Sequence, residues 1–190
     1  MKEREHGNPV FRSFRPALVL IVVGIIAAAG ALALARSLRE RSLVTGDARW
    51  IWFSLDIDEP GPLRFYTQRD FTLETVPASA KAKLFIDRRG SLIINGSRFV
   101  LSEQGPGSRL HVLEVAPALV TGVNRTVIEA ESPTGAGGIL FCLDLPQGRR
   151  VVSDRSWRVS LSQAVLARGG GALAGVWGKP PMYPWGYPKE

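Results

Sequence analysis

A run of 19 residues near the N-terminus, from Ala17 to Ala35, carries no charge and no strongly hydrogen-bonding side chain. As an α-helix that rises about 1.5 Å per residue, this run spans roughly 28 Å, close to the ~30 Å hydrocarbon core of a bilayer. Pro16 precedes it, where a missing N–H costs a helix little, and Arg36 follows it. A buried helix of a globular domain rarely stays apolar on every face over this length. The run therefore predicts one transmembrane helix over residues 17–36, in contact with the lipid bilayer.

A cleaved secretory signal peptide is the alternative explanation of the same run. Its end, ALALA at residues 31–35, supplies the A-x-A spacing of a cleavage site. The polar segment before the run and the run itself are both longer than in a typical signal peptide. The anchor is the favoured interpretation, and cleavage stays open.

The net charge is +7, and its distribution argues against nucleic-acid binding. Residues 1–40 hold six basic and three acidic residues, and residues 41–190 hold 18 basic and 14 acidic residues. Beyond residue 40 the basic residues are scattered, whereas a nucleic-acid surface gathers them with aromatic side chains. We therefore predict no nucleic-acid partner, and we interpret the arginines as solvated strand faces with attraction to lipid headgroups near the helix.

At Arg49 the period of the sequence changes from helical to alternating. From there, short segments rich in β-branched and aromatic residues are separated by Gly, Pro, Asn or Asp. Many short strands at this spacing indicate an antiparallel β-sandwich or barrel. The segment RWIWFSL at 49–55 is apolar on both faces, which predicts a strand covered on both sides. The predicted organisation is a basic tail at 1–16, a transmembrane helix at 17–36, a linker at 37–48, a β-sandwich at 49–165 and a C-terminal tail at 166–190.

The segment KLFIDRRGSLIINGSRFVL at 83–101 reads as short strands joined by tight turns. DRRG at 87–90 is one predicted turn. Asn95-Gly96 is the other, because this pair tolerates positive φ at both central positions of a type I′ hairpin turn. On this interpretation Gly96→Val costs about 1–3 kcal/mol through backbone strain, and Asn95→Asp is mild.

Six pieces of sequence follow one another in a recognisable order between about residues 49 and 161. They are WIW at 50–52, FYTQRDFTL at 65–73, VPASAKAKLFID at 76–87, LIINGSRFVL at 92–101, LEVAPALVTGVNRTVIEAES at 113–132 and VVSDRSWRVS at 151–160. The ordered set resembles the galactose-binding-like β-sandwich, or jelly roll, in the N-terminal part of bacterial α-L-rhamnosidases. The resemblance implies this fold behind a membrane anchor.

The same resemblance implies little about activity. The sequence leaves no room for the catalytic domain of those enzymes, and Asp87, Arg88 and Ser91 depart from the residues expected around the opening stretch. A shared fold does not by itself carry a function. The resemblance therefore implies no rhamnosidase activity, and carbohydrate binding only loosely.

Residues suited to catalysis or metal binding are sparse. The two histidines are His6 in the tail and His111 in a strand pattern, so we expect no catalytic triad. Asp56, Asp58 and Glu59 are weak candidates for a Ca²⁺ site or for the carboxylate pair of a glycosidase, with an ordinary acidic turn as the simpler interpretation. We predict a protein that is not an enzyme and has no cofactor.

One face of the predicted transmembrane helix carries small residues spaced three and four apart. Such a face lets another helix approach closely, although Ala and Gly are common in membrane helices generally. It predicts contact with other transmembrane subunits. The face comprises Gly24, Ala27, Ala28, Ala31 and Ala35.

The C-terminal tail combines a glycine-rich hinge at 169–171 with aromatic residues among prolines. Proline keeps a segment extended and lowers the entropy lost on docking. Trp, Tyr and Met favour interface cores and membrane headgroup belts. The tail either docks on a partner or packs back on its own sandwich. Its candidate docking residues are Trp177, Met182, Tyr183, Trp185 and Tyr187.

These features lead to two functions of different class. The first is a non-catalytic accessory subunit that stabilises a larger bacterial membrane complex, with photosynthetic and respiratory complexes as the first to examine. The second is a membrane-tethered carbohydrate-binding module of the cell envelope, and a hydrolase is a distant third. We expect the bacterial inner membrane, with the sandwich outside the cytoplasm, because a long domain is exported largely regardless of flanking charge.

Overall fold

The computed structural model of the protein describes residues 14–41, 44–55 and 61–190, and divides the chain into two compact units, Met1–Ser42 and Leu43–Glu190. In the first unit, helix α1 (Phe14–Arg41) extends beyond both ends of the predicted helix. Its side chains are described for residues 19–35, and all of these are exposed. Among the described residues, no helix combines the length and the hydropathy needed to cross a membrane. The anchor predicted over 17–36 is therefore not confirmed.

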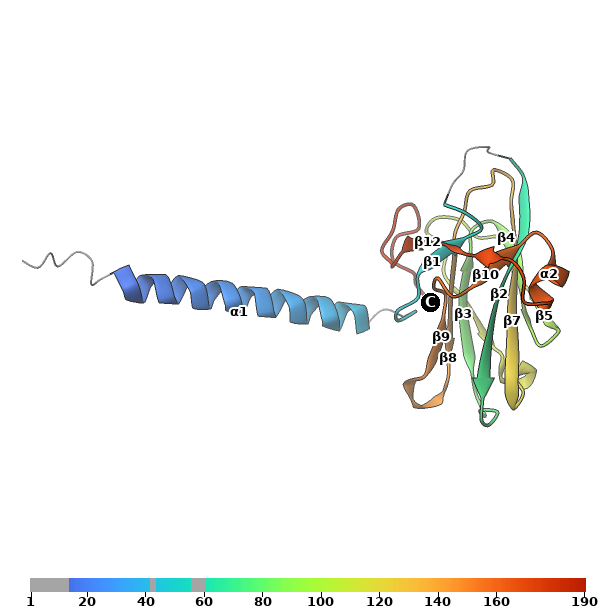
Figure 1. Ribbon diagram of the computed structural model, residues 1–190, viewed down its shortest axis with the longest axis horizontal. Coiled ribbons are helices and arrows are strands. Elements are labelled where there is room, and N and C mark those ends of the chain that lie inside the picture. The colour runs from blue at the N-terminus through green and yellow to red at the C-terminus, as the bar shows by residue number, and fades with distance from the viewer. Residues whose placement is uncertain (1–13, 42–43, 56–60) are drawn as a thin grey trace, which may run out of the picture. The chain divides into compact units, whose positions relative to one another are not determined.

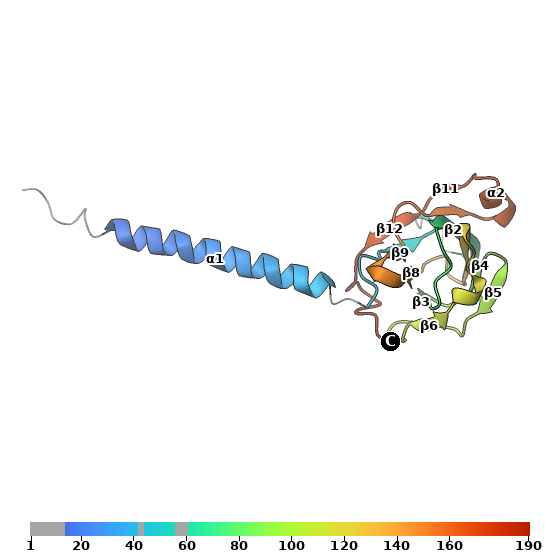
Figure 2. The same ribbon diagram turned by 90° about the horizontal axis from the view of Figure 1, so that it is seen from below.

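The second unit is a β-sandwich, as predicted, in which the described residues form two antiparallel six-stranded sheets (Figures 1 and 2). The first sheet has the order β12–β1–β8–β3–β6, with β9 paired to β8, and the second has the order β11–β10–β2–β7–β4–β5. The first-sheet strands are β12 (Gly175–Gly178), β1 (Trp50–Trp52), β8 (Ile139–Asp144), β3 (Lys81–Ile86), β6 (His111–Glu114) and β9 (Arg150–Val152). The second-sheet strands are β11 (Ala172–Leu173), β10 (Arg158–Ser160), β2 (Leu63–Leu73), β7 (Gly122–Ser132), β4 (Arg89–Ile94) and β5 (Ser97–Val100).

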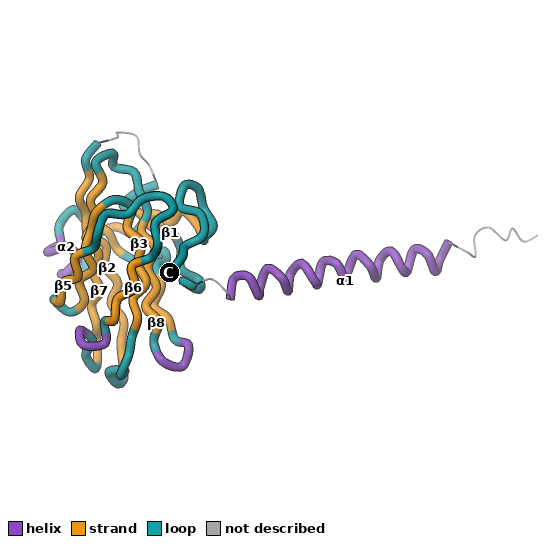
Figure 3. The backbone as a smooth tube through the Cα atoms, turned by 180° about the vertical axis from the view of Figure 1, so that it is seen from behind, coloured by secondary structure: helices purple, strands orange, loops and turns teal. Residues whose placement is uncertain are grey.

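Short helical segments occupy the connections between strands (Figure 3). They are α2 (Gln163–Ala167) and two single 3₁₀ turns, η2 (Ala116–Ala118) and η3 (Pro146–Gly148). Among the described residues after Arg41, α2 is the longest helix, at five residues. This agrees with the alternating pattern of the sequence, which supports strands and not amphipathic helices.

The chain passes from one sheet to the other at two tight loops, one of which is the turn predicted at 87–90. Ile86 ends β3 in the first sheet and Arg89 begins β4 in the second, so Asp87 and Arg88 bridge the two layers. The 133–138 loop likewise leads from β7 in the second sheet to β8 in the first. The predicted turn at 87–90 is thus a crossing between layers and not a hairpin. The Asn95-Gly96 turn is confirmed, because both residues have positive φ, +49° and +90°, and β4 pairs directly with β5 across it.

The core between the sheets is built on large aromatic side chains. Trp52 meets Phe65 edge to face with ring centroids 4.9 Å apart, and Phe141 meets Trp157 at 5.3 Å. All four are buried, and Trp50 is buried as well. The strand tryptophans are therefore buried packing residues.

The C-terminal segment covers the outer face of the first sheet. Trp185 stacks on Trp50 with ring centroids 4.4 Å apart, and its indole N–H donates to Asp87 Oδ2 at 2.9 Å. A Cβ at Gly138 would lie 2.7 Å from the ring of Trp185, so glycine is what lets this ring approach the sheet. This cover explains why residues 49–55 are apolar on both faces. β11 and β12 come from the predicted tail at 166–190, so the sandwich extends into the segment that was predicted to be a separate region.

One lysine joins the beginning and the end of the second unit. The Nζ of Lys83 donates to the carbonyl oxygen of Val44 at 3.0 Å. The same ammonium lies 2.8 Å from Asp144 Oδ2 and 2.6 Å from Glu190 Oε1. The backbone N–H of Leu110 donates to the carbonyl of Lys189 at 2.7 Å, which fixes the last residues against the first sheet.

Candidate functional site

The outer face of the second sheet carries a row of polar side chains at the end where β2 and β4 begin, unlike the covered outer face of the first. On β2, Phe65 and Thr67 point into the core, and Arg64 and Tyr66 point outward between them. The register places Tyr66 opposite Glu129 of β7, and Glu129 opposite Ser91 of β4. The pleat of three neighbouring strands therefore brings these polar side chains into one row.

Glu129 is the centre of this row and is only 3% exposed. Arg64 donates to its Oε1 twice, once from Nε at 2.8 Å and once from Nη2. Arg98 Nη2 donates to Oε2 at 2.5 Å and the hydroxyl of Ser91 donates to Oε2 at 3.1 Å. The Tyr66 hydroxyl lies 3.3 Å from Oε1. A buried carboxylate is stable only with partners of this kind.

The electrostatics of Glu129 suit binding better than proton transfer. Burial works to raise the pKa of Glu129, but the hydrogen bonds from Arg64 and Arg98 outweigh it, so this pKa lies below its usual value. The same contact raises the pKa of Arg64. A general acid at neutral pH needs a raised carboxyl pKa. Glu129 therefore acts as a fixed charge that holds two arginines in place.

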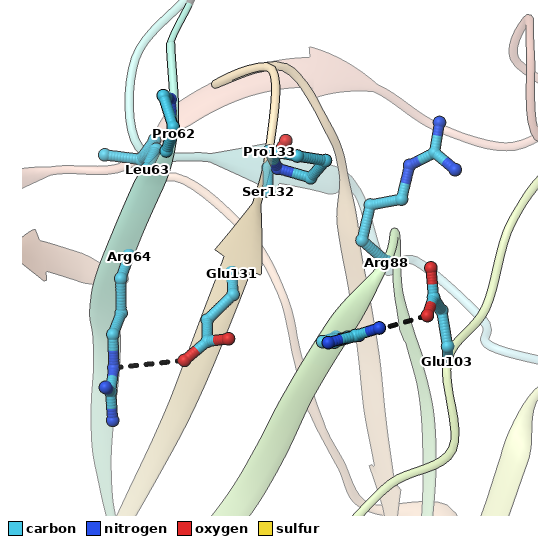
Figure 4. A pocket seen from close by; sticks show the side chains of 9 residues that line it. Pro62, Leu63, Arg64, Arg88, Glu103, Glu131, Ser132 and Pro133 are labelled. Atoms are coloured by element: carbon cyan, nitrogen blue, oxygen red, sulfur yellow. Dashed lines mark hydrogen bonds and ion pairs between the residues drawn. The ribbon is translucent and has the colours of Figure 1, made fainter.

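A pocket of ≈ 450 Å³ lies where β2 and β4 begin and β7 ends (Figure 4). Figure 4 shows Arg64 and Glu131 together on one side, and Arg88 and Glu103 on the other. Arg64 Nε is 3.3 Å from Glu131 Oε1, and Arg89 Nε is 3.0 Å from Glu103 Oε2. The pocket is lined by Pro62, Leu63, Arg64, Arg88, Arg89, Glu103, Glu131, Ser132 and Pro133.

A second hollow, of ≈ 280 Å³, continues from the pocket over Glu129 and Arg98, and it shares four lining residues with the pocket. We call the pocket and this hollow together the arginine–glutamate groove. Guanidinium groups supply only donors and carboxylates supply only acceptors, so their alternation suits a ligand with neighbouring hydroxyl groups. The shared residues are Arg64, Arg89, Glu103 and Glu131.

The residues predicted for metal binding and for helix packing stay predictions. Asp56, Asp58 and Glu59 lie outside the described residues. Within the described ranges, no group of three His, Cys, Asp or Glu side chains is placed to hold a metal ion. The five small residues of the α1 face, namely Gly24, Ala27, Ala28, Ala31 and Ala35, are all exposed.

The five aromatic and methionine residues of the tail divide into two groups. Trp177, Met182 and Trp185 pack against the buried cluster on the outer face of the first sheet. Tyr183 is 94% exposed and Tyr187 is exposed as well. The tail thus packs back on its own sandwich, which is one of the two outcomes that the sequence left open. Of the five, Tyr183 and Tyr187 are exposed enough to contact a docking partner.

No pattern in the sequence predicts the arginine–glutamate groove. The arginines are predicted to be scattered solvated charges, although Arg64, Arg98 and Glu129 meet in one cluster. The one local signal is Glu129 itself, which sits between Ile128 and Ala130 in a strand whose neighbours are buried. A carboxylate in such a strand needs a cationic partner, but only the strand register says which arginines supply it.

Comparison of the sequence with known proteins gives no match. No protein-family model matches the chain. No curated protein sequence matches it either.

Comparison of the fold with solved structures gives clear matches. An α-L-rhamnosidase of Streptomyces avermitilis, solved with L-rhamnose, matches with a TM-score of 0.61 at 19% identity, over 75% of this chain and 16% of that one. A GH78 rhamnosidase of Bacillus sp. GL1 also matches with a TM-score of 0.61 at 19% identity, over 75% of this chain and 19% of that one. A lectin of Pleurotus ostreatus, solved with GalNAc, matches with a TM-score of 0.60 at 19% identity, over 75% of this chain and 46% of that one.

The matched region thus spans between 16% and 46% of the length of those proteins. At 19% identity the likeness shows the fold alone. The resemblance drawn from the sequence is confirmed at that level: the second unit is a galactose-binding-like β-sandwich similar to those of α-L-rhamnosidases and of a lectin.

Proposed function

We propose that this chain is a non-catalytic carbohydrate-binding module that holds its ligand in the arginine–glutamate groove. The observation that carries the proposal is the groove itself, in which fixed arginines and glutamates alternate on the open face of the second sheet. Its fold is similar to that of a lectin solved with GalNAc. This favours the second of the two functions drawn from the sequence over the first.

The groove offers both kinds of contact that a sugar needs. Arg64 and Arg89 can donate to ring hydroxyls, and Glu103 and Glu131 can accept from them. Their ion pairs hold these groups in place before the ligand arrives, which lowers the entropy lost on binding. Three apolar residues of the lining, Pro62, Leu63 and Pro133, provide a surface for the C–H face of a sugar ring.

A glycan array probed with the full chain in detergent tests the proposal. We expect a defined set of oligosaccharides to bind, and Glu131→Gln to weaken that binding about ten-fold, because the amide loses the charged acceptor. Glu74→Gln is the matched control, since Glu74 is exposed just beyond the far end of β2 and leaves the groove intact. Absence of binding to every glycan would refute the proposal.

We also propose that α1 attaches the module to the bacterial inner membrane, with the sandwich outside the cytoplasm. The support is the uncharged run from Ala17 to Ala35, together with the exposure of large apolar side chains such as Leu20 and Ile26, 72% and 65%. Apolar surface of this extent is stable only when lipid or protein covers it. Protease added to intact spheroplasts should digest residues 44–190, and their full protection would contradict the orientation.

An accessory subunit of a larger membrane complex is the second candidate. One observation favours it, namely that Gly24 and Ala28 lie about one turn apart on α1 and are both exposed. Gly24→Leu combined with Ala28→Leu should then block the approach of a neighbouring helix and release partner subunits from the protein in mild detergent. Unchanged co-purification of partners in this variant, or no partner at all with the native chain, would leave the carbohydrate-binding module as the function.

A further inference from the structure

Arg88 holds a backbone conformation that few residues of its kind adopt. Its φ is +80°, in the left-handed region that disfavours side chains other than glycine, asparagine and aspartate. A conformation of this kind is strained and persists only where its surroundings impose it. Such residues are concentrated at functional sites, so the position of Arg88 needs an explanation beyond a simple turn.

Gln104 imposes the conformation. The N–H of Arg88 donates to the carbonyl of Gln104 at 2.9 Å, and the N–H of Gln104 donates back to the carbonyl of Arg88 at 2.9 Å. Gln104 is buried, and its side chain accepts from the N–H of Ile86 at 3.0 Å and donates to the carbonyl of Arg109. The backbone of Arg88 is thus anchored on a buried glutamine, which fixes the direction in which its side chain leaves the chain.

The side chain so directed lines the pocket of the arginine–glutamate groove. Figure 4 shows Arg88 without a hydrogen bond or ion pair to the other residues that line the pocket, whereas Arg64 is joined to Glu131. The Nε of Arg88 forms a long ion pair with Asp87 Oδ1, at 3.8 Å, which is too far for a hydrogen bond. The two glutamates of the pocket are thus engaged by Arg64 and Arg89, and the half-exposed side chain of Arg88 lines the same pocket without a carboxylate partner among the lining residues.

We propose that Arg88 is the specificity-determining residue of the groove and that it selects carbohydrates that carry a carboxylate. A planar guanidinium with paired donors matches a carboxylate in a two-bond arrangement, which a neutral hydroxyl pair cannot equal in strength. The paired arginines and glutamates beside it then contact the hydroxyls of the same sugar. This inference rests on the proposed function, because it names the class of sugar that the groove takes.

Matched ligands that differ only in charge test the inference. Oligosaccharides of galacturonate, glucuronate and sialate, each as free acid and as methyl ester, are titrated into the full chain in neutral detergent by calorimetry. We expect at least one free acid to bind about ten-fold or more tightly than its ester, and rising salt to weaken the acid and not the ester. Arg88→Gln should bring the Kd of the acid to that of the ester, without changing the Kd of the ester.

The control is Arg149→Gln, because Arg149 is an exposed arginine in the turn between β8 and β9, at the opposite end of the sandwich (Figure 1). It should keep the preference for the acid. Acetate at the same ionic strength should not displace the bound oligosaccharide; displacement at equal concentration would mean that any carboxylate suffices, and would overturn the inference.

Three further results separate the inference from the proposed function. Equal binding of acids and esters, or of neutral glycans alone, would overturn the role of Arg88 and leave the carbohydrate-binding module standing. A preference for acids that survives Arg88→Gln would also overturn it. Failure of every glycan, charged or neutral, would remove the proposed function and the inference together.

Discussion

At the scale of single residues, the molecule depends on one buried carboxylate. Glu129 is held by Arg64 and Arg98, whose side chains are 59% and 47% exposed, so the ion pairs form at the boundary between core and solvent. Both arginines belong to the groove and owe their position there to this contact. Loss of the carboxylate should therefore disturb both the stability of the sheet and the shape of the groove.

Glu129→Gln tests this dependence. The amide keeps the volume but leaves Arg98 without its charged partner and Arg64 with Glu131 alone. We expect a loss of about 1–3 kcal/mol in the free energy of unfolding. Because the pKa of Glu129 is lowered in the folded protein, the native carboxylate stabilises the fold above its unfolded pKa near ~4.3, and this contribution is lost as pH falls through the folded pKa. Denaturation by urea should show a gap between the two proteins at pH 7 that closes in acid; a gap independent of pH would contradict the assignment.

Cys142 gives a second prediction at this scale. Burial, assisted by the nearby charge of Asp144, raises the pKa of the Cys142 thiol to about 12, and the thiolate is the reactive form. We expect no labelling of the native protein by iodoacetamide at pH 8 and complete labelling of the urea-unfolded chain. Rapid labelling of the folded protein would show that the interior of β8 opens to solvent.

The sequence predicts buried residues better than it predicts the charged cluster. Trp50, Trp52 and Trp157 follow from apolar alternation, which is a local signal. Arg64 and Glu129 are 65 positions apart and meet only because β2 and β7 pair in one register over 11 residues. A shift by one residue would turn Glu129 into the core, so its role depends on long-range pairing that no local pattern records.

At the scale of elements, the β4–β5 turn shows how the residues of a turn fix the pairing of two strands. Gly96 has φ +90°, and the space around it sets no limit on a side chain, since a Cβ there would meet nothing within 4 Å. The cost of Gly96→Val is therefore backbone strain alone, about 1–3 kcal/mol in the free energy of unfolding. Thermal melting checks it, with Gly105→Val as a control at a loop glycine that also has open space. Equal melting temperatures in the two variants would contradict the turn type.

Asn95→Asp should be more costly than the sequence indicates. The side-chain amide of Asn95 donates to the carbonyl of Ala118 at 2.9 Å and to Asn124 Oδ1 at 2.8 Å. A carboxylate would lose both bonds and face two acceptor oxygens. We expect a loss of about 1–3 kcal/mol, which should shrink when acid protonates the new carboxylate. A variant as stable as the native chain at neutral pH would show that these two contacts contribute nothing.

The C-terminal segment behaves as part of the sandwich, and its composition alone could not show this. Aromatic residues among prolines fit a docking tail and a folded-back cover equally well. The deciding contact is the stacking of Trp185 on Trp50, which joins residues 135 positions apart in the sequence. If the tail were a separate docking segment, removal of residues 176–190 would leave the sandwich intact. Because the tail is part of the fold, its removal should instead expose the outer face of the first sheet.

Trp185→Ala measures that cover. It removes the stacked ring and the hydrogen bond to Asp87 Oδ2. Because the ring is only partly buried, we expect a loss of about 2–3 kcal/mol in the free energy of unfolding, less than for a fully buried Trp. Tyr183→Ala is the control, because Tyr183 is exposed and should change stability by less than ~0.5 kcal/mol. Comparable losses in both variants would mean that the tail does not pack as described.

At the scale of the whole molecule, the order of parts is predictable and the layering is less so. The change of period at Arg49 predicts a helix and then a β-sandwich, and the described elements keep that order. The crossing between sheets at Asp87 and Arg88 does not follow, because a turn within a sheet and a turn between sheets use the same residue types. This crossing is what brings Arg88 to the groove.

The contacts of the Lys83 ammonium bear on whether the sandwich can be circularly permuted. The ammonium contacts both Val44 and Glu190, so the two ends of the second unit lie within a few ångströms of one nitrogen atom. A domain whose ends meet can be cut and rejoined without crossing its core. A circular permutant that joins residue 190 to residue 44 through a short glycine linker, with new ends in the 105–108 loop, should keep the same strand order. The module can therefore be inserted whole into a loop of another protein.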